Sequence, residues 1–309
     1  MTTQPAQEEG EYHMPVLLRE AVEGLAVREN GVYADCTFGG GGHSREILKN
    51  LGKEGKLFVF DQDAAAKVNL PQGDDRVVFI QQNFRHLSRF LKLHGVEKLD
   101  GILADLGVSS HQFDEAERGF STRFDGPMDM RMDKRQPRTA AMVLKEMPAA
   151  ELHKMFEIYG EVTNSKTLAN TIAAQRGLNA VETIKQFKQA VQAVVKGNPN
   201  KYFAQVFQAL RIEVNDELGA LKEMLEQAPG LLKAGGRLVI ISFHSLEDRL
   251  VKNFLKYNNF SGEVVTDAFG HSPEKQWNII TKKPITAGPP EMKKNSRSRS
   301  AKLRIGERK

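Results

Sequence analysis

The stretch DCTFGGGGHS, residues 35–44, places four consecutive glycines between a short apolar run and the expected start of a helix. Glycine loses more backbone entropy on folding than any other residue, so such a run needs a compensating reason. A tight turn without a ligand is one interpretation. The other is a ligand seat, because a strand, a glycine-rich turn and a helix N-terminus together present free backbone N–H groups with no Cβ to keep a ligand away.

Acidic residues near this loop indicate the kind of ligand. Asp61 follows Gly39 by 22 residues and ends an apolar run, where a carboxylate accepts hydrogen bonds from the two hydroxyls of a ribose. Asp35 opens the loop, and Ser44 stands where a dinucleotide fingerprint has its last glycine. An acid at the loop start repels a pyrophosphate but suits a cationic amino-acid group. We therefore predict S-adenosyl-L-methionine as the cofactor, with Asp35, Gly39 and Asp61 among its contacts.

A further acid, Asp105, ends the apolar run in LDGILADLG. In an open α/β sheet, ligands bind at the carboxyl ends of the strands, so this position faces the reactive end of the cofactor. Asp105 is our candidate catalytic residue, as the acceptor for an amine that is being methylated. Capping of the following turn is the alternative role for an aspartate at this place.

Apolar runs separated by helical patterns predict the elements that position these residues. An open, doubly wound α/β sheet is indicated because strands alternate with helices in the first part of the chain. From about residue 115 to 202 the pattern is helical only, which predicts an inserted all-helical subdomain. Seven strands are expected, at 31–38, 56–61, 76–82, 99–107, 235–243, 276–281 and 301–307. The predicted domains are 1–114, 115–202 and 203–309, with one long helical stretch at 203–228 and a loop before the last strand.

Composition excludes several classes of protein. The chain has 309 residues, no apolar run of membrane-spanning length and no signal-peptide pattern, so we expect a cytoplasmic protein with no membrane contact. Its single cysteine, Cys36, excludes a disulfide framework. Its histidines form no pair at i, i+4 spacing, so no metal site is expected.

Charge is concentrated at the C-terminus. Residues 293–309 hold eight Lys or Arg and one Glu, which indicates contact with a polyanion such as nucleic acid, although a solvated tail is the alternative. Residues 118–135 mix arginines with phenylalanines, a combination that suits RNA, but the same stretch also carries acids that would fit a salt-bridged linker.

Longer motifs carry a resemblance to a known family. They include HMPVLLREAVEGL, DCTFGGGGHSREIL, DGILADLGVSSHQFDEAERGFS and SRSRSAKLRIGER, and the match runs nearly end to end. The chain resembles the MraW family of bacterial methyltransferases, which modify the exocyclic N4 of a cytidine in small-subunit ribosomal RNA. The resemblance implies a seven-stranded, Rossmann-like class I methyltransferase sheet with a helical insertion. It also implies 16S rRNA within the 30S subunit as partner, modified in the decoding region near the P site.

The resemblance assigns further residues. It places Gly41, Gly42 and His43 at the methionine end of the cofactor, Asp61 at the ribose, Phe84 beside the adenine, and Asp105 and Gln112 beyond the fourth strand. Base flipping would expose the target amine. Candidate substrate contacts are Ser109, Ser110, His244 and Ser245, with a structural role as the alternative for His244.

Three other functions stay open from the sequence. A nicotinamide-dependent oxidoreductase would use the same kind of sheet, and a non-catalytic RNA-binding or assembly factor would keep the fold without turnover. A methyltransferase acting on protein or DNA would keep the cofactor site. The sequence leaves a homodimer open and does not determine the oligomeric state.

Overall fold

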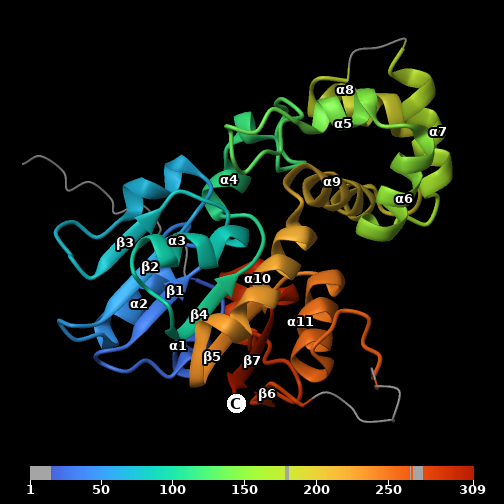
Figure 1. Cartoon of the computed structure of the whole chain (residues 1–309). Coiled ribbons are helices and arrows are strands. Elements are labelled where there is room, and N and C mark those ends of the chain that lie inside the picture. The colour runs from blue at the N-terminus through green and yellow to red at the C-terminus, as the bar shows by residue number, and fades with distance from the viewer. Residues whose placement is uncertain (1–14, 178–180, 265, 267–273) are drawn as a thin grey trace, which may run out of the picture.

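Seven strands form one sheet in the order β3-β2-β1-β4-β5-β7-β6 (Figure 1). The computed structural model describes residues 15–177, 181–264, 266 and 274–309. The strands are β1 (Val32–Asp35), β2 (Lys56–Phe60), β3 (Val77–Ile80), β4 (Leu99–Asp105), β5 (Leu232–Ser242), β6 (Trp277–Ile279) and β7 (Lys302–Arg308). Strands β1 to β5 pair in parallel, whereas β7 is antiparallel to both β5 and β6. The predicted α/β class and all seven expected strands are confirmed.

Helices cover both faces of the sheet, because successive side chains of each strand point to opposite sides. Along β2, for example, Leu57 packs into one core and Phe58 into the other. The core around Phe58 also contains side chains of α3 (Leu87–Leu93), α10 (Glu217–Leu231) and α11 (Ser245–Tyr257). The core around Leu57 contains those of α1 (Leu18–Leu25) and α2 (Gly42–Asn50). Cys36 is buried in the core around Phe58, where it acts as a small packing residue.

A third core lies outside the sheet, in a group of helices that Figure 1 shows set apart from it. This group consists of α5 (Ala140–Glu146), α6 (Ala149–Gly160), α7 (Ser165–Gln175), α8 (Ile184–Val191) and α9 (Pro199–Asn215), with the short η4 (Gln192–Val194). Its buried apolar residues begin at Phe120 and run to Val214. The helical region expected after β4 is thus a separate packing unit, and α9 contributes to it.

Two local expectations were wrong. The stretch 203–228 is two helices, because Asp216 adopts a left-handed conformation (φ 47°, ψ 46°) between α9 and α10, which aspartate tolerates better than most residues. The segment expected as a loop before β7 contains α12 (Pro289–Lys294) and η5 (Ser296–Ser300). Glu291 fixes α12, since its carboxylate accepts a hydrogen bond of 2.8 Å from the backbone N–H of Leu17.

The remaining short elements stand at the carboxyl ends of the strands or close to them. They are α4 (Ser110–Asp114), η1 (Ala64–Asn69), η2 (Phe84–His86) and η3 (Ala116–Arg118). Within the described part of the chain, no helix combines the length and apolar character needed to cross a membrane.

Candidate functional site

The glycine loop turns sharply between β1 and α2. Gly39 and Gly41 have φ values of +49° and +72°, which residues with a Cβ rarely adopt, and α2 begins at Gly42. The Gly39 N–H donates a hydrogen bond of 2.8 Å to the Asp61 carboxylate. The loop and the end of β2 are therefore held together by one of the acids that the sequence predicted for cofactor binding.

Asp61 accepts two backbone hydrogen bonds. Its second oxygen accepts from the Asp63 N–H at 2.8 Å. Burial raises the pKa of Asp61 to about 6, although these two hydrogen bonds act to lower it. The nearby charges of Asp63 and Asp35 add to the rise. A carboxylate has about four acceptor positions, so Asp61 keeps capacity for the hydroxyl groups of a ribose.

Asp35 is buried at the end of β1. The Ser44 hydroxyl donates to one oxygen at 2.6 Å and the Thr37 N–H to the other at 3.1 Å. Burial raises the pKa of Asp35, and the hydrogen bond from Ser44 opposes that rise. The sequence identified Ser44 only as a departure from a dinucleotide fingerprint, and its hydrogen bond to Asp35 depends on the sharp turn between β1 and α2.

Asp105 ends β4 beside the same loop. Its backbone N–H donates to the Thr37 hydroxyl at 2.6 Å, which ties β4 to the second residue after β1. One carboxyl oxygen, Oδ1, is buried without a hydrogen-bond partner among the described residues. Burial raises the pKa of Asp105 well above its ordinary value, and the charges of Asp35 and Glu247 raise it further.

His43 connects this carboxyl to the N-terminal segment. Its Nε2 lies 3.1 Å from the Val16 carbonyl oxygen, and its Nδ1 lies 3.7 Å from the second oxygen of Asp105. A carbonyl oxygen only accepts hydrogen bonds, so the proton of a neutral ring sits on Nε2 and the lone pair of Nδ1 faces Asp105. Burial lowers the pKa of His43, which favours this neutral form.

The short helix α4 packs next to the glycine loop. Ser109, its N-cap, lies beside Gly39, where an added Cβ would meet the Ser109 Cβ at 3.8 Å. The Gln112 side chain makes two hydrogen bonds: its oxygen accepts from the Ser109 N–H at 3.2 Å and its nitrogen donates to Asp63 at 2.8 Å. Ser110 is the first residue of α4, and its side chain lies outside the description.

A buried ion pair that the sequence analysis missed supports this arrangement. Arg118 and Asp63 are 3% and 7% exposed, and their charged groups are 2.6 Å apart. Arg118 also donates to the carbonyl oxygens of Arg131 and Met132. It thereby joins the loop after β2 to the start of the helical region, a contact that spans 55 residues and leaves no local pattern.

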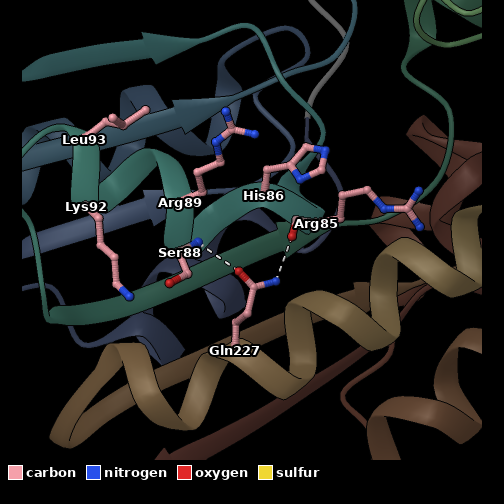
Figure 2. A pocket seen from close by; sticks show the side chains of 7 residues that line it. All are labelled: Arg85, His86, Ser88, Arg89, Lys92, Leu93 and Gln227. Carbon is pink, nitrogen blue, oxygen red and sulfur yellow. Dashed lines mark hydrogen bonds between the residues drawn. The ribbon is translucent and has the colours of Figure 1, made fainter.

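Phe84 is placed by η2, directly after β3. Gln227 of α10 holds this segment, since its amide donates to the Arg85 carbonyl at 2.8 Å and accepts from the Ser88 N–H at 2.9 Å (Figure 2). A surface hollow of about 550 Å³ lies here, lined by Arg85, His86, Ser88, Arg89, Lys92, Leu93 and Gln227. Neither the glycine loop nor Asp105 lines it, so this hollow is separate from the predicted site.

His244 and Ser245 lie at the start of α11, next to β4 because β5 pairs with it. His244 is the N-cap: its Nδ1 accepts from the Glu247 N–H at 3.5 Å, and its own N–H donates to the Glu247 carboxylate at 3.4 Å, which completes a capping box. The Ser245 hydroxyl donates to Glu161 of the helical region at 2.9 Å. His244 thus caps α11 and Ser245 contacts the insertion, and contact of either residue with a substrate stays a prediction.

Ligand-type atoms of Glu217, His244 and Glu247 lie within 4.8 Å of one another. Arg211 lies against this trio, with hydrogen bonds of 2.7 and 2.9 Å to the Glu217 carboxylate. Burial acts to raise the pKa of Glu247, but its contacts with the His244 ring and the nearby Arg211 guanidinium lower it overall. A side-chain cation thus already balances these acids, and the expected absence of a metal stays a prediction.

A sheet of this strand order, with a glycine loop after β1 and acids at the ends of β1, β2 and β4, defines a class I methyltransferase. The chain belongs to the MraW methylase family, whose model matches residues 10–309. The predicted resemblance is confirmed. S-adenosyl-L-methionine is the cofactor of this class of enzyme, as the loop and its acids predicted.

Curated relatives match nearly the whole chain. Ribosomal RNA small subunit methyltransferase H of Parabacteroides distasonis is 52% identical, with 96% of this chain and 97% of that protein covered. The protein of the same name from Phocaeicola vulgatus is 50% identical, with 96% and 97% covered. Among solved structures, fibrillarin of Aeropyrum pernix with bound S-adenosyl-L-methionine is 10% identical, has a TM-score of 0.40 and is matched over 94% of this chain and 73% of its own.

Proposed function

We propose that the protein methylates the exocyclic N4 amine of a cytidine in the decoding region of 16S rRNA, near the P site, within the 30S subunit. Membership of the MraW methylase family and the names of the relatives, which act on small-subunit ribosomal RNA, support the substrate class. The observation that carries the chemistry is the buried, partnerless oxygen of Asp105 beside the glycine loop.

The charges at the strand ends fit a cationic cofactor. Burial raises the pKa of Asp35, Asp61 and Asp105, the charge of Asp35 raises that of the other two further, and no Lys or Arg pairs with any of the three among the described residues. A sulfonium and an ammonium group would relieve this repulsion, whereas a pyrophosphate would increase it. When bound, the cofactor supplies an electrophilic methyl group. Asp61 would hold its ribose, Phe84 its adenine, and Asp35 with the Gly39–His43 loop its methionine end.

Asp105 would remove the proton of the amine. The lone pair of a cytidine N4 is delocalised into the ring, so transfer needs an acceptor that helps the nitrogen become tetrahedral. When N4 takes the methyl group, the S–CH₃ bond would break with S-adenosylhomocysteine as the leaving group, and the Asp105 carboxylate would accept the N–H proton. The sulfonium charge of the bound cofactor would favour the ionised form of Asp105, which burial and the charges of Asp35 and Glu247 otherwise disfavour.

The starts of α4 and α11 flank this position and would contact the substrate. They carry Ser109, Ser110, His244 and Ser245, and both follow neighbouring strands, β4 and β5. Holding the flipped base between these two helix starts would align its amine with the methyl group.

Methylation of small subunits from cells that lack this protein tests the proposal. Purified protein and labelled S-adenosyl-L-methionine should yield N4-methylcytidine, identified by the mass of the digested nucleosides. Asp105→Asn should lose turnover by about 100-fold or more and still bind S-adenosylhomocysteine, which lacks the sulfonium charge. Asp75→Asn, an exposed acid before β3, is the matched control and should be fully active.

Two results would overturn parts of this proposal. Label found in protein or DNA instead of RNA would contradict the substrate while keeping the cofactor site. A turnover number for Asp105→Asn close to that of the wild type would contradict the role of Asp105.

A further inference from the structure

The basic C-terminal region divides into an internal part and an exposed part. In β7, Arg304 and Lys302 pair with Asp248 at 2.6 and 3.4 Å, and Arg304 is only 7% exposed. The charges of Arg304 and Lys302 are therefore paired within the protein itself. Before β7, by contrast, Lys293 and Lys294 of α12 and Arg299 of η5 are exposed, and none of the three has an ion pair among the described residues.

The exposed part is anchored to α4. The Arg297 guanidinium lies 5.0 Å from the ring centre of Phe113 and 3.4 Å from the Asp114 carboxylate. Arg297 therefore fixes η5 against the last turn of α4, although the two are 183 residues apart in the sequence. The basic segment is thus part of the folded surface, which excludes the alternative of a solvated tail for these residues.

A second segment reaches the same place. Arg123 lies in the loop after η3, which contacts α4, the helix that holds Arg297. Burial lowers the pKa of Arg297, and the charge of Arg123 lowers it further. Arg123 is exposed, and the adjacent Phe124 leaves 46% of its surface exposed. We call the set Arg123, Phe124, Lys293, Lys294, Arg297 and Arg299 the basic rim.

The basic rim is close to the candidate site because both use α4. The N-cap of this helix, Ser109, lies against Gly39 of the glycine loop, and its C-terminal residues Phe113 and Asp114 hold the rim. A five-residue helix is about 7.5 Å long, similar to the spacing of one to two nucleotides in a strand. Like charges placed together on an exposed surface are stabilised by a polyanion.

We propose that the basic rim binds the phosphates of single-stranded RNA next to the nucleotide in the active site, while Phe124 stacks on a base. This inference rests on the proposed function for what happens at Asp105, and it adds the surface that holds the flanking strand. Arginine and lysine neutralise phosphates, and an exposed aromatic ring offers a face to any base.

Binding of a labelled single-stranded RNA of about a dozen nucleotides, measured by fluorescence anisotropy at several salt concentrations, tests the inference. Arg123→Ala, Arg299→Ala and the double variant Lys293→Ala/Lys294→Ala should each weaken binding. Each lost phosphate contact should reduce the slope of log affinity against log salt by about 0.7. Phe124→Ala should weaken binding by about tenfold with an unchanged slope, because stacking releases no counterions.

Lys53→Ala is the matched control, because Lys53 is exposed between α2 and β2. It lies at the amino end of β2, whereas the candidate site lies at the carboxyl ends of the strands. It should bind RNA like the wild type, and all variants should keep the wild-type affinity for S-adenosyl-L-methionine. Unchanged slopes in the rim variants would overturn the inference. Loss of activity on 30S subunits with unchanged binding of free RNA would also overturn it, in favour of a ribosomal protein as the partner.

The outcome is separable from that of the proposed function, since RNA binding is read without methyl transfer. Reduced slopes without any N4-methylcytidine would support the rim and contradict the proposed reaction. N4-methylcytidine formed equally well by the rim variants, with wild-type slopes, would support the reaction and contradict the rim.

Discussion

Protonation of Asp61 is expected to weaken cofactor binding below about pH 6. Burial raises the pKa of this carboxyl from 3.8 to about 6, so acidification over a mild range converts it to the neutral acid. The two hydroxyls of a ribose donate hydrogen bonds best to a carboxylate, which only accepts. The protein with ionised Asp61 is therefore the form that binds.

The size of the effect follows from the pKa. With a value of about 6, roughly nine tenths of the molecules are ionised at pH 7 and roughly one tenth at pH 5. The Kd should therefore be about tenfold higher at pH 5 than at pH 7 and nearly constant above pH 7.

Isothermal titration with S-adenosylhomocysteine between pH 5 and 8 measures this change. This ligand lacks the sulfonium charge, so its binding depends less on Asp35 and Asp105 and more on the nucleoside contacts. Asp61→Asn should bind more weakly at pH 7 and lose most of the pH dependence, whereas Asp75→Asn should behave as the wild type. A Kd for the wild type that stays constant from pH 5 to 8, or an unchanged dependence in Asp61→Asn, would refute the reasoning.

The same carboxyl makes the unliganded fold less stable at neutral pH. Because its folded pKa is raised, the folded protein binds this proton more tightly than the unfolded chain. The Asp61 contribution to stability is present below pH 4 and is lost as the pH rises through about 6. The difference between 3.8 and about 6 corresponds to about 3 kcal/mol, which cofactor binding has to offset.

Two substitutions test the support of the site. Arg118→Met should lower the free energy of unfolding in urea by about 3–5 kcal/mol, because it leaves the buried Asp63 carboxylate unpaired, and adding Asp63→Asn should restore part of the loss. Full additivity of the two changes would contradict the pairing. Gly42→Ala should destabilise the protein by about 1–3 kcal/mol and weaken cofactor binding, since its Cβ would lie 2.0 Å from Pro15 Cγ. Gly40→Ala, with nothing within 4 Å of the added Cβ, is the control, and an equal loss in both variants would contradict the steric argument.

The sequence by itself determined the sheet and the position of the loop. Strands such as VVFI and LDGILAD are apolar runs of strand length, and burial of parallel strands on both faces requires that pattern in the chain itself. The acids Asp35, Asp61 and Asp105 were found for a similar local reason. Each ends a strand, and the topology then brings the carboxyl ends of β1, β2 and β4 to one edge.

Only the tertiary structure decided how these residues are held. Thr37 bonds to Asp105 across 68 residues, and Arg118 pairs with Asp63 across 55. Arg297 and Arg304 have the same side chain and lie seven positions apart, yet one belongs to an exposed rim and the other is buried against Asp248. Helical and strand patterns arise from neighbours in the sequence, whereas the partner of a charge depends on which distant side chain the fold brings within about 3–4 Å.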